Sequence, residues 1–495
     1  MRASLTHRGQ CRVFPLLDRA AGMLLAGLLA GCQVGPAFRL PATAIPPRFT
    51  ARLGASGAAN APPAWPRPGW WRKFGSAELS GLVGAARAHN FSIREAVAQL
   101  EIANAEVLGA GAPLLPTLDA SGSGSFSQAG NATSSGSAAR FAGGGKNIDT
   151  RQFATSFNAS YQLDFWGKNR DALRAAEANA AAARFNTATV ALTVEASVAT
   201  TYFQALADSD QLRTARRNLA AARGLLAQLR AELTAGIADA PTVAQQAALV
   251  AAEAATIPNL TSAYRQQVIA LGTLTGQAPE FLHVTGGSLG ALHVPRIRPG
   301  LPAELLSRRP DIAQAQAVLE AANANVRGAI AAFFPAISLT GALGWQSAAL
   351  EQLFAPGSLL LSAASSIAQP IFDGGALLAT LRVDRGTWDQ DVAQYEAAVV
   401  QAFSDVETAM TALHYATRQE ALQARAVARA RAALAAAEAQ LHAGVVDIGT
   451  VLNAEQTLLS DQNTLITARL TRLDAAVDLY KALGGGWVLP TAREQ

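Results

Sequence analysis

The chain has 495 residues, of which 50% are hydrophobic and only 15% charged, and its formal net charge is +4. Soluble proteins carry about 25% charged residues, so this chain lacks the usual charged surface, while its apolar content excludes disorder over most of its length. Its two cysteines, Cys11 and Cys32, exclude a scaffold held together by several disulfides.

The first 31 residues are typical of a bacterial lipoprotein signal peptide. Four arginines precede an apolar run from Ala20 to Ala30, which is far shorter than the ~20 residues of a membrane-spanning helix. The run leads into Leu29-Ala30-Gly31-Cys32, which is similar to the lipobox at which such peptides are cleaved. We expect cleavage before Cys32 and lipidation of its thiol, which would anchor the chain. An ordinary cysteine in a signal peptide is the alternative. The residue after Cys32 is Gln33 rather than Asp, which by analogy with bacterial lipoprotein sorting permits passage to the outer membrane.

Cleavage also removes positive charge. Residues 1–31 contain four arginines and one aspartate, so the mature chain has a net charge of +1. It has no basic patch with interleaved aromatic residues, the pattern typical of nucleic-acid binding. We therefore expect no nucleic-acid partner.

Prolines divide the mature chain into segments. Eight of them lie between residues 33 and 68, which predicts a lipidated, extended tether over 32–75. No proline occurs from Leu118 to Ala240 or from Ile371 to Leu489, and a proline inside a helix costs ~3 kcal/mol or more. Both stretches are rich in good helix formers, which predicts helices over 168–234 and 376–443. Each would be about 100 Å long at ~1.5 Å per residue, so we expect an elongated protein.

The chain consists of two similar halves. A pattern of Leu, Gly, Asp, Thr and Val at 233–243 recurs 208 residues later at 441–451, and recurrence of this kind indicates an internal repeat. Each repeat contains a helix, two strands, a long helix, a turn and a return helix. The expected segments are a first repeat at 76–280, a connector at 281–308, a second repeat at 309–484 and a tail at 485–495. The return helices are expected at 240–276 and 448–484.

Four stretches alternate polar and apolar residues with the period of two that is typical of strands. They lie near 117–128, 152–164, 336–346 and 358–370. Each is close to the ~9–11 residues that cross a bilayer as a tilted strand, and the polar positions are mostly Ser, Thr, Asn and Gln. The pattern favours a membrane barrel that is apolar outside and polar inside. A soluble sandwich is the alternative.

Four strands do not close a barrel. An open sheet in lipid leaves backbone groups unpaired at several kcal/mol each, and known membrane barrels have about eight strands or more. We therefore expect several chains to share one barrel. On these grounds a dimer, a trimer and a tetramer all remain open.

Five motifs point to one family. They are Cys32-Gln33-Val34-Gly35-Pro36, Trp70-Trp71-x-x-Phe74, Ser307-Arg308-Arg309-Pro310-Asp311-Ile312, Gln369-Pro370-Ile371-Phe372-Asp373-Gly374-Gly375 and Leu479-Tyr480-Lys481-Ala482-Leu483-Gly484-Gly485-Gly486-Trp487. Together they resemble the TolC/NodT-type outer-membrane factor family, the lipoprotein channels of tripartite efflux pumps. The resemblance extends over essentially the whole mature chain.

The resemblance implies an α+β membrane protein. Three chains would form a homotrimer, with a twelve-stranded β-barrel in the lipid of the outer membrane and a twelve-helix α-barrel in the periplasm. Segment 281–308 would belong to an equatorial region. The implied partners are a periplasmic adaptor, or membrane fusion, protein and an inner-membrane transporter of the resistance-nodulation-division (RND) type. The function would be passive export of drugs and other toxic small molecules, with a role in multidrug resistance. The resemblance also implies palmitate among the lipids on Cys32.

The resemblance also implies that the lower ends of the helices form a closed aperture. The candidate aperture residues lie at the two turns and are Asp239, Thr242, Asp447, Thr450 and Asn453. The family often has a ring-forming Asp at the position of Asn453. Because Asn453 is neutral, we expect an entrance that binds cations less, although Asp239 and Asp447 lie nearby.

The sequence contains no recognisable catalytic or metal-binding constellation. The six histidines are scattered, with no pair at helical spacing, and there is no phosphate-binding loop or nucleophile elbow. We expect neither an enzyme nor a cofactor or metal, apart from the covalent lipid on Cys32. Two alternative functions remain open, a channel for type I protein secretion and a lipid-anchored periplasmic scaffold without a channel.

Overall fold

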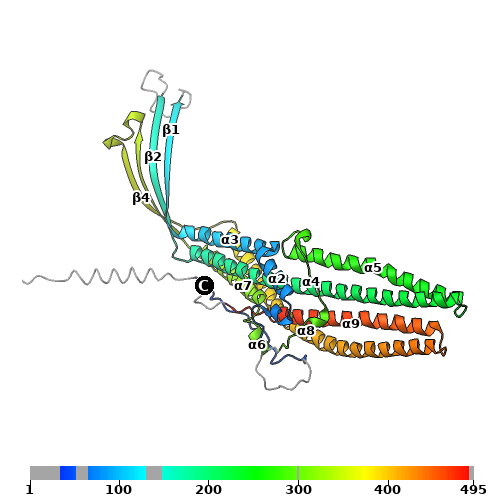
Figure 1. Cartoon of the computed structure of the whole chain (residues 1–495). Helices are drawn as coiled ribbons and strands as arrows, with labels where there is room; N and C mark the ends of the chain where they lie inside the picture. The colour runs from blue at the N-terminus through cyan, green and yellow to red at the C-terminus, as the bar shows by residue number, and fades with distance from the viewer. Residues whose placement is uncertain (1–33, 52–64, 130–147, 298–299, 490–495) are drawn as a thin grey trace, which may run out of the picture. The chain divides into compact units, whose positions relative to one another are not determined.

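The computed structural model describes residues 34–51, 65–129, 148–297 and 300–489. Cys32 and the signal peptide lie outside the described residues. The chain divides into two compact units (Figure 1). We call them the sheet unit (1–39, 103–180 and 318–391) and the hairpin unit (40–102, 181–317 and 392–495).

The sheet unit contains one antiparallel sheet with the strand order β1-β2-β3-β4. The strands are β1 (Thr117–Ala129), β2 (Ile148–Leu163), β3 (Ala336–Ser347) and β4 (Leu359–Ala368). β2 begins four residues before the predicted position, and β4 ends two residues before it. Within the described residues β1 and β4 each have one strand neighbour, so the sheet has two open edges.

The register separates apolar from polar side chains. Phe157 lies opposite Leu343, and Leu343 lies opposite Leu361, so apolar residues of three strands share one face. On the other face the hydroxyl groups of Ser121 and Ser156 lie 3.0 Å apart. Because side chains alternate between the faces of a strand, the whole sheet has one apolar face and one hydroxyl-rich face.

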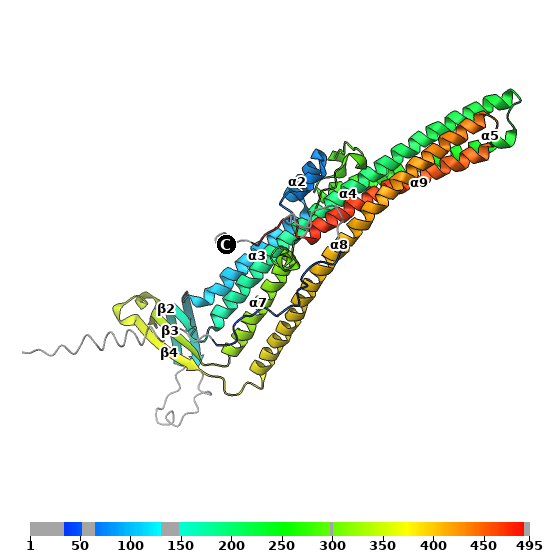
Figure 2. The same ribbon diagram turned by 90° about the horizontal axis from the view of Figure 1, so that it is seen from below.

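The helices account for most of the chain. Their bounds are α2 (Ala77–His89), α3 (Phe91–Gly111), α4 (Lys168–Thr234), α5 (Ala240–Leu274), α6 (Pro302–Leu305), α7 (Pro310–Ala331), α8 (Ala376–His442) and α9 (Ile448–Ala482). In the hairpin unit α5 lies beside α4 and α9 lies beside α8, in both views (Figures 1 and 2). Among the described residues, no helix combines the length and the apolar content needed to cross a membrane.

An aromatic cluster forms the centre of the hairpin unit. Trp70 stacks on Tyr480 with ring centroids 5.1 Å apart, and Phe74 lies 5.1 Å from Phe203. All four side chains are almost completely buried. The cluster joins the N-terminal segment to α4 and α9. Burial of each large apolar side chain contributes about 1.5–3 kcal/mol to stability, so these contacts hold the segment in place.

Two predicted boundaries need correction. Residues 70–74, assigned to the extended tether, form a 3-10 helix whose two tryptophans and Phe74 are buried. The segment predicted as a tail at 485–495 also begins inside the packed structure, because the rings of Trp487 and Phe185 lie edge to face with their centroids 5.8 Å apart. Proline content indicates where a helix cannot form, but it does not reveal where an aromatic side chain finds a core.

Candidate functional site

The two helical hairpins end in turns of matching geometry, which we call the tip turns (235–239 and 443–447). In the first, Gly236 has a φ of +71° and donates its N–H to the carbonyl of Leu233 at 3.0 Å. The N–H of Ile237 donates to the carbonyl of Glu232 at 2.9 Å. This pair of hydrogen bonds closes a helix C-terminus around a glycine, and the second turn has the same arrangement at Gly444.

The predicted aspartates cap the return helices. The Asp239 carboxylate accepts the N–H of Thr242 at 3.1 Å, and the Asp447 carboxylate accepts the N–H of Thr450 at 3.0 Å. The Thr450 hydroxyl donates to Asp447 as well, at 2.9 Å. Hydrogen bonds from these threonines lower the pKa of both aspartates, which therefore remain charged. Such a cap stabilises the start of a helix because it pairs a backbone N–H that has no partner within the helix.

Asn453 lies on the exposed surface of α9, and its backbone carbonyl accepts a hydrogen bond from the Thr457 hydroxyl at 2.8 Å. Among the described residues no hydrogen bond joins its side chain to Asp239 or Asp447. The structure therefore places the five predicted aperture residues at or near the tip turns and shows a capping role for four of them.

Apolar packing joins the two hairpins near their tips. Leu229 of α4 forms a buried cluster with Ala437 of α8 and with Ile448 and Val451 of α9. Val451 is fully buried, so this contact excludes water between the hairpins.

Two apolar side chains in the tip turns remain uncovered. Ile237 is 78% exposed and Val445 is 71% exposed. Neither residue was predicted as a site residue, although the two are related by the same 208-residue offset as the neighbouring aspartates. Exposed apolar residues at the same place in two matching turns suit contact with another protein.

A second set of contacts holds the helices where the long hairpins begin. Arg309 is 8% exposed and donates to the Asp405 carboxylate at 2.9 Å and, through Nε, to the Asp311 carboxylate at 2.9 Å. It also donates to the carbonyl of Ala482 at 3.3 Å. Burial lowers the pKa of Arg309, but the hydrogen bonds that its guanidinium donates to both carboxylates, together with their negative charge, outweigh burial and raise the pKa. We call these four residues the Arg309 clamp; it joins α7, α8 and α9.

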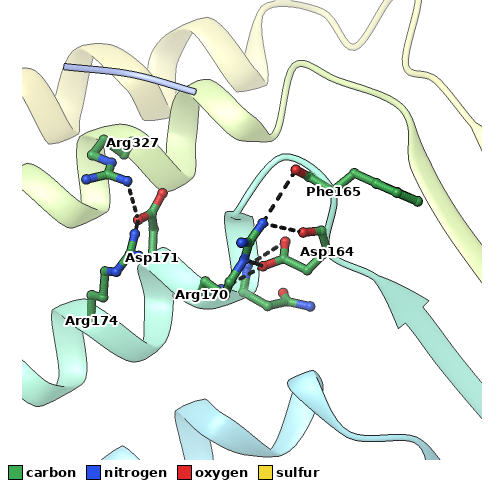
Figure 3. Close-up of polar contacts among 7 residues, drawn as sticks. Asp164, Phe165, Arg170, Asp171, Arg174 and Arg327 are labelled. Atoms are coloured by element: carbon green, nitrogen blue, oxygen red, sulfur yellow. Dashed lines mark hydrogen bonds and ion pairs between the residues drawn. The ribbon is translucent and has the colours of Figure 1, made fainter. Parts of the chain in front are cut away.

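A third arrangement, in the sheet unit, fixes the start of α4 (Figure 3). The Asp164 carboxylate accepts the N–H of Arg170 at 2.9 Å and its Nε at 3.2 Å. The next residue, the fully buried Asp171, contacts Arg327 of α7 at 3.1 Å and Arg174 at 2.9 Å. These ion pairs link the beginning of α4 to the helix that precedes β3.

The Phe165-Trp166-Gly167 motif lies in the same region. The indole N–H of Trp166 donates to the carbonyl of Pro335 at 2.9 Å, and its ring stacks on Phe334 with centroids 4.8 Å apart. Gly167 has a φ of +85°, a conformation that favours glycine. The motif therefore joins the two halves of the chain just below the sheet.

Comparison with known proteins decides the family. The model of the family described as outer membrane efflux protein matches residues 82–277 and 301–485. The chain belongs to the outer membrane efflux protein family. Since members of this family are transport conduits, this outer membrane efflux protein serves as an efflux exit duct and is not an enzyme.

Relatives and solved structures match over nearly the whole chain. The pyoverdine export outer membrane protein OpmQ of Pseudomonas putida is 36% identical over 86% of this chain and 89% of its own. The cation efflux system protein CusC of Escherichia coli (strain K12) is 30% identical over 92% and 97%. The open-state MtrE outer membrane channel of Neisseria gonorrhoeae is 30% identical over 93% and 100%, with a TM-score of 0.80. These likenesses place this efflux protein in the outer membrane.

Half-buried carboxyl groups in the hairpins of this efflux protein were not predicted. Burial raises the pKa of Glu455 to about 7, with further contributions from Glu253 and Glu438. Burial also raises the pKa of Asp474 to about 7, and the neighbouring Asp478 adds to the effect. Within the described residues no group of three or more His, Cys, Asp or Glu side chains could hold a metal ion. No local pattern identifies these carboxyl groups, because their environment comes from neighbouring helices.

Glu455→Gln is expected to flatten the pH dependence of stability. The folded-state pKa of about 7 lies above the ordinary value of 4.5. The stability that Glu455 contributes is therefore complete below about pH 4.5 and is lost as the pH rises through about 7. Wild-type melting temperatures should fall between pH 5 and pH 8, and the variant should recover about 2–4 °C of that fall. Thermal unfolding in detergent measures this, with Glu232→Gln at a partly exposed position of α4 as control. Superimposable profiles of Glu455→Gln and wild type would contradict it.

Proposed function

We propose that three copies of this outer membrane efflux protein assemble into a homotrimer that encloses a twelve-stranded β-barrel. The observation that carries the proposal is the four-stranded sheet, which has open edges at β1 and β4 and opposite apolar and polar faces. Pairing β1 of one copy with β4 of the next removes the open edges, which lipid does not tolerate. The apolar face would then contact lipid and the hydroxyl-rich face would line the duct.

The helices of the same trimer would form a twelve-helix barrel that extends into the periplasm. The two halves of the chain contribute equally to it, because α4 and α8 both have 67 residues and α5 and α9 both have 35. This equality supports an internal repeat. Segment 281–308 would form the equatorial connector between the repeats.

In this assembly the duct passively exports small molecules that a periplasmic adaptor and an inner-membrane transporter of the RND type deliver. The tip turns would be the docking point, since Ile237 and Val445 are exposed there. The relatives OpmQ and CusC are named for pyoverdine export and for cation efflux, which supports a duct that does not choose its cargo. Drugs and other toxic compounds are the expected cargo, with a role in multidrug resistance.

A covalent lipid on Cys32 would anchor the mature chain to the outer membrane, with palmitate among its acyl groups. The support is the lipobox-like sequence that ends at Cys32, together with the firm anchoring that several acyl chains provide. The intact mass of the purified protein should exceed that of residues 32–495 by the lipid mass. Cys32→Ser should abolish this excess; an unmodified Cys32 in the wild type would contradict the assignment.

Conductance and drug susceptibility test the proposed duct. The purified protein should elute as a trimer. It should conduct ions in planar bilayers once Val451→Asp introduces charge into the buried apolar contact near the tip turns, because we expect that contact to hold the proposed aperture closed. A deletion strain should become at least fourfold more susceptible to several drugs. A trimer that never conducts would favour the scaffold, and unchanged drug susceptibility with loss of a secreted protein would favour type I secretion.

Asn453→Asp is expected to make the entrance more cation-selective. Three added carboxylates in the trimer would attract cations by Coulomb interaction at short range, at a position that is exposed on α9. Reversal potentials in a salt gradient measure the selectivity, and Asn463→Asp provides the same charge farther from the tip turn. Identical reversal potentials for Asn453→Asp and wild type would rule out this role of Asn453.

A further inference from the structure

A cavity of about 420 Å³ lies between α4, α5 and α9 of the hairpin unit. Its walls include the apolar side chains of Leu260 and Leu459. Three carboxamide side chains, Asn218, Asn259 and Asn463, also line it. Pockets that bind drug-sized molecules have volumes of about 300–1,000 Å³ and are mostly apolar with a few polar groups, so both the size and the lining suit a small organic ligand.

One carboxylate lines this cavity. Glu253 is 8% exposed, and its Oε2 is buried without a hydrogen-bond partner among the described residues. Burial raises the pKa of Glu253. A buried charge is costly unless a partner of opposite charge or several hydrogen bonds compensate it, and the three surrounding carboxamides do not supply that charge.

The neighbouring helices add negative charge. Glu455 of α9 also has a buried oxygen, Oε2, without a hydrogen-bond partner, and both Glu253 and Glu438 act on it electrostatically. Within the described residues none of these three carboxylates forms a salt bridge with a lysine or an arginine. The region between α5, α8 and α9 therefore attracts a cation.

We propose that this cavity binds an amphiphilic organic cation, that is, an ammonium group carried by an apolar body. The ammonium would pair with Glu253 and donate its remaining hydrogens to the carboxamide oxygens of residues such as Asn259, while the apolar body would pack against Leu260 and Leu459. A metal ion fits less well, because no three acidic, His or Cys side chains come together in the described part of the chain. The site is independent of the proposed duct, since binding requires neither conductance nor a partner protein.

Dansylcadaverine is a suitable probe, because it joins a primary ammonium to an environment-sensitive aromatic ring. Titrated into the purified full-length protein in detergent, it should bind saturably at one site per chain with increased fluorescence. Glu253→Gln should weaken binding at least tenfold, because a charge-assisted hydrogen bond becomes a neutral one. Ala255→Phe, which narrows the cavity at an exposed lining position, should also weaken binding at least tenfold.

Two controls separate binding in the cavity from uptake into detergent. Glu232→Gln removes the same charge from a partly exposed position outside the cavity and should bind within twofold of wild type. N-acetylated dansylcadaverine, which has no charge, should bind at least tenfold more weakly than the amine. Equal binding by Glu253→Gln and Glu232→Gln, or by the amine and its acetylated form, would overturn the proposal. So would displacement of the probe by millimolar Mg²⁺, which would indicate a metal site. If Glu253→Gln does not fold, the acetylated probe and Ala255→Phe decide the question.

Discussion

Arg309→Ala is expected to lower the stability of the hairpin unit by about 3 kcal/mol, the low end of the range for breaking a buried ion pair. Arg309 is 8% exposed, and removal of its side chain leaves Asp311, Asp405 and the Ala482 carbonyl without their shared donor. The cost stays at the low end because both aspartates are about one-third exposed and regain part of their hydration.

Thermal unfolding of the detergent-solubilised protein, followed by circular dichroism, measures this loss. Arg308→Ala is the matched control, because the Arg308 side chain stacks on the Trp65 ring at 4.6 Å and forms no salt bridge in the described structure. Its loss should cost less than about 1 kcal/mol. Arg309→Lys should recover only part of the stability, since an ammonium cannot reproduce the guanidinium's paired contacts. Equal melting temperatures for Arg308→Ala and Arg309→Ala would show that the clamp contributes nothing specific.

Gly484→Ala is expected to destabilise the protein by about 2–5 kcal/mol. Gly484 has a φ of +81°, a conformation that costs a residue with a side chain about 1–2 kcal/mol. An added Cβ would also overlap the backbone carbonyl oxygen of Arg308, and steric overpacking costs about 1–3 kcal/mol. Because Arg308 precedes the clamp residue, the substitution should also disturb the contacts of Arg309.

Gly84→Ala separates these effects from glycine replacement in general. Gly84 lies on the exposed surface of α2, and an added Cβ would meet nothing within 4 Å. Since alanine favours a helix by about 1 kcal/mol over glycine, this variant should be neutral or slightly more stable. If Gly84→Ala and Gly484→Ala melt at the same temperature, the close approach of residue 484 to Arg308 has no energetic weight.

The long elements could be predicted from the sequence because their signals are local. No proline occurs from Leu118 to Ala240, which permits a long helix there, and Gly236 indicates where that helix ends. In the structure α4 ends at Thr234. Alternation with a period of two located all four strands, and Asp239 and Asp447 stood out through their repetition. Helix termini and strand periodicity depend on residues close together in the chain, so composition and spacing reveal them.

The sequence by itself determined the long helices, the four strands and the family. Only the tertiary structure decided what the individual residues do. It placed Trp70 in a core with Tyr480, gave Arg309 partners from α8 and α9, and brought Glu253 near Glu455. These contacts join residues that are far apart in the chain, and the burial that raises a pKa or leaves a carboxylate unpartnered arises only when the helices pack. Local patterns therefore predict which elements form, whereas the chemistry of the hairpins follows from their packing.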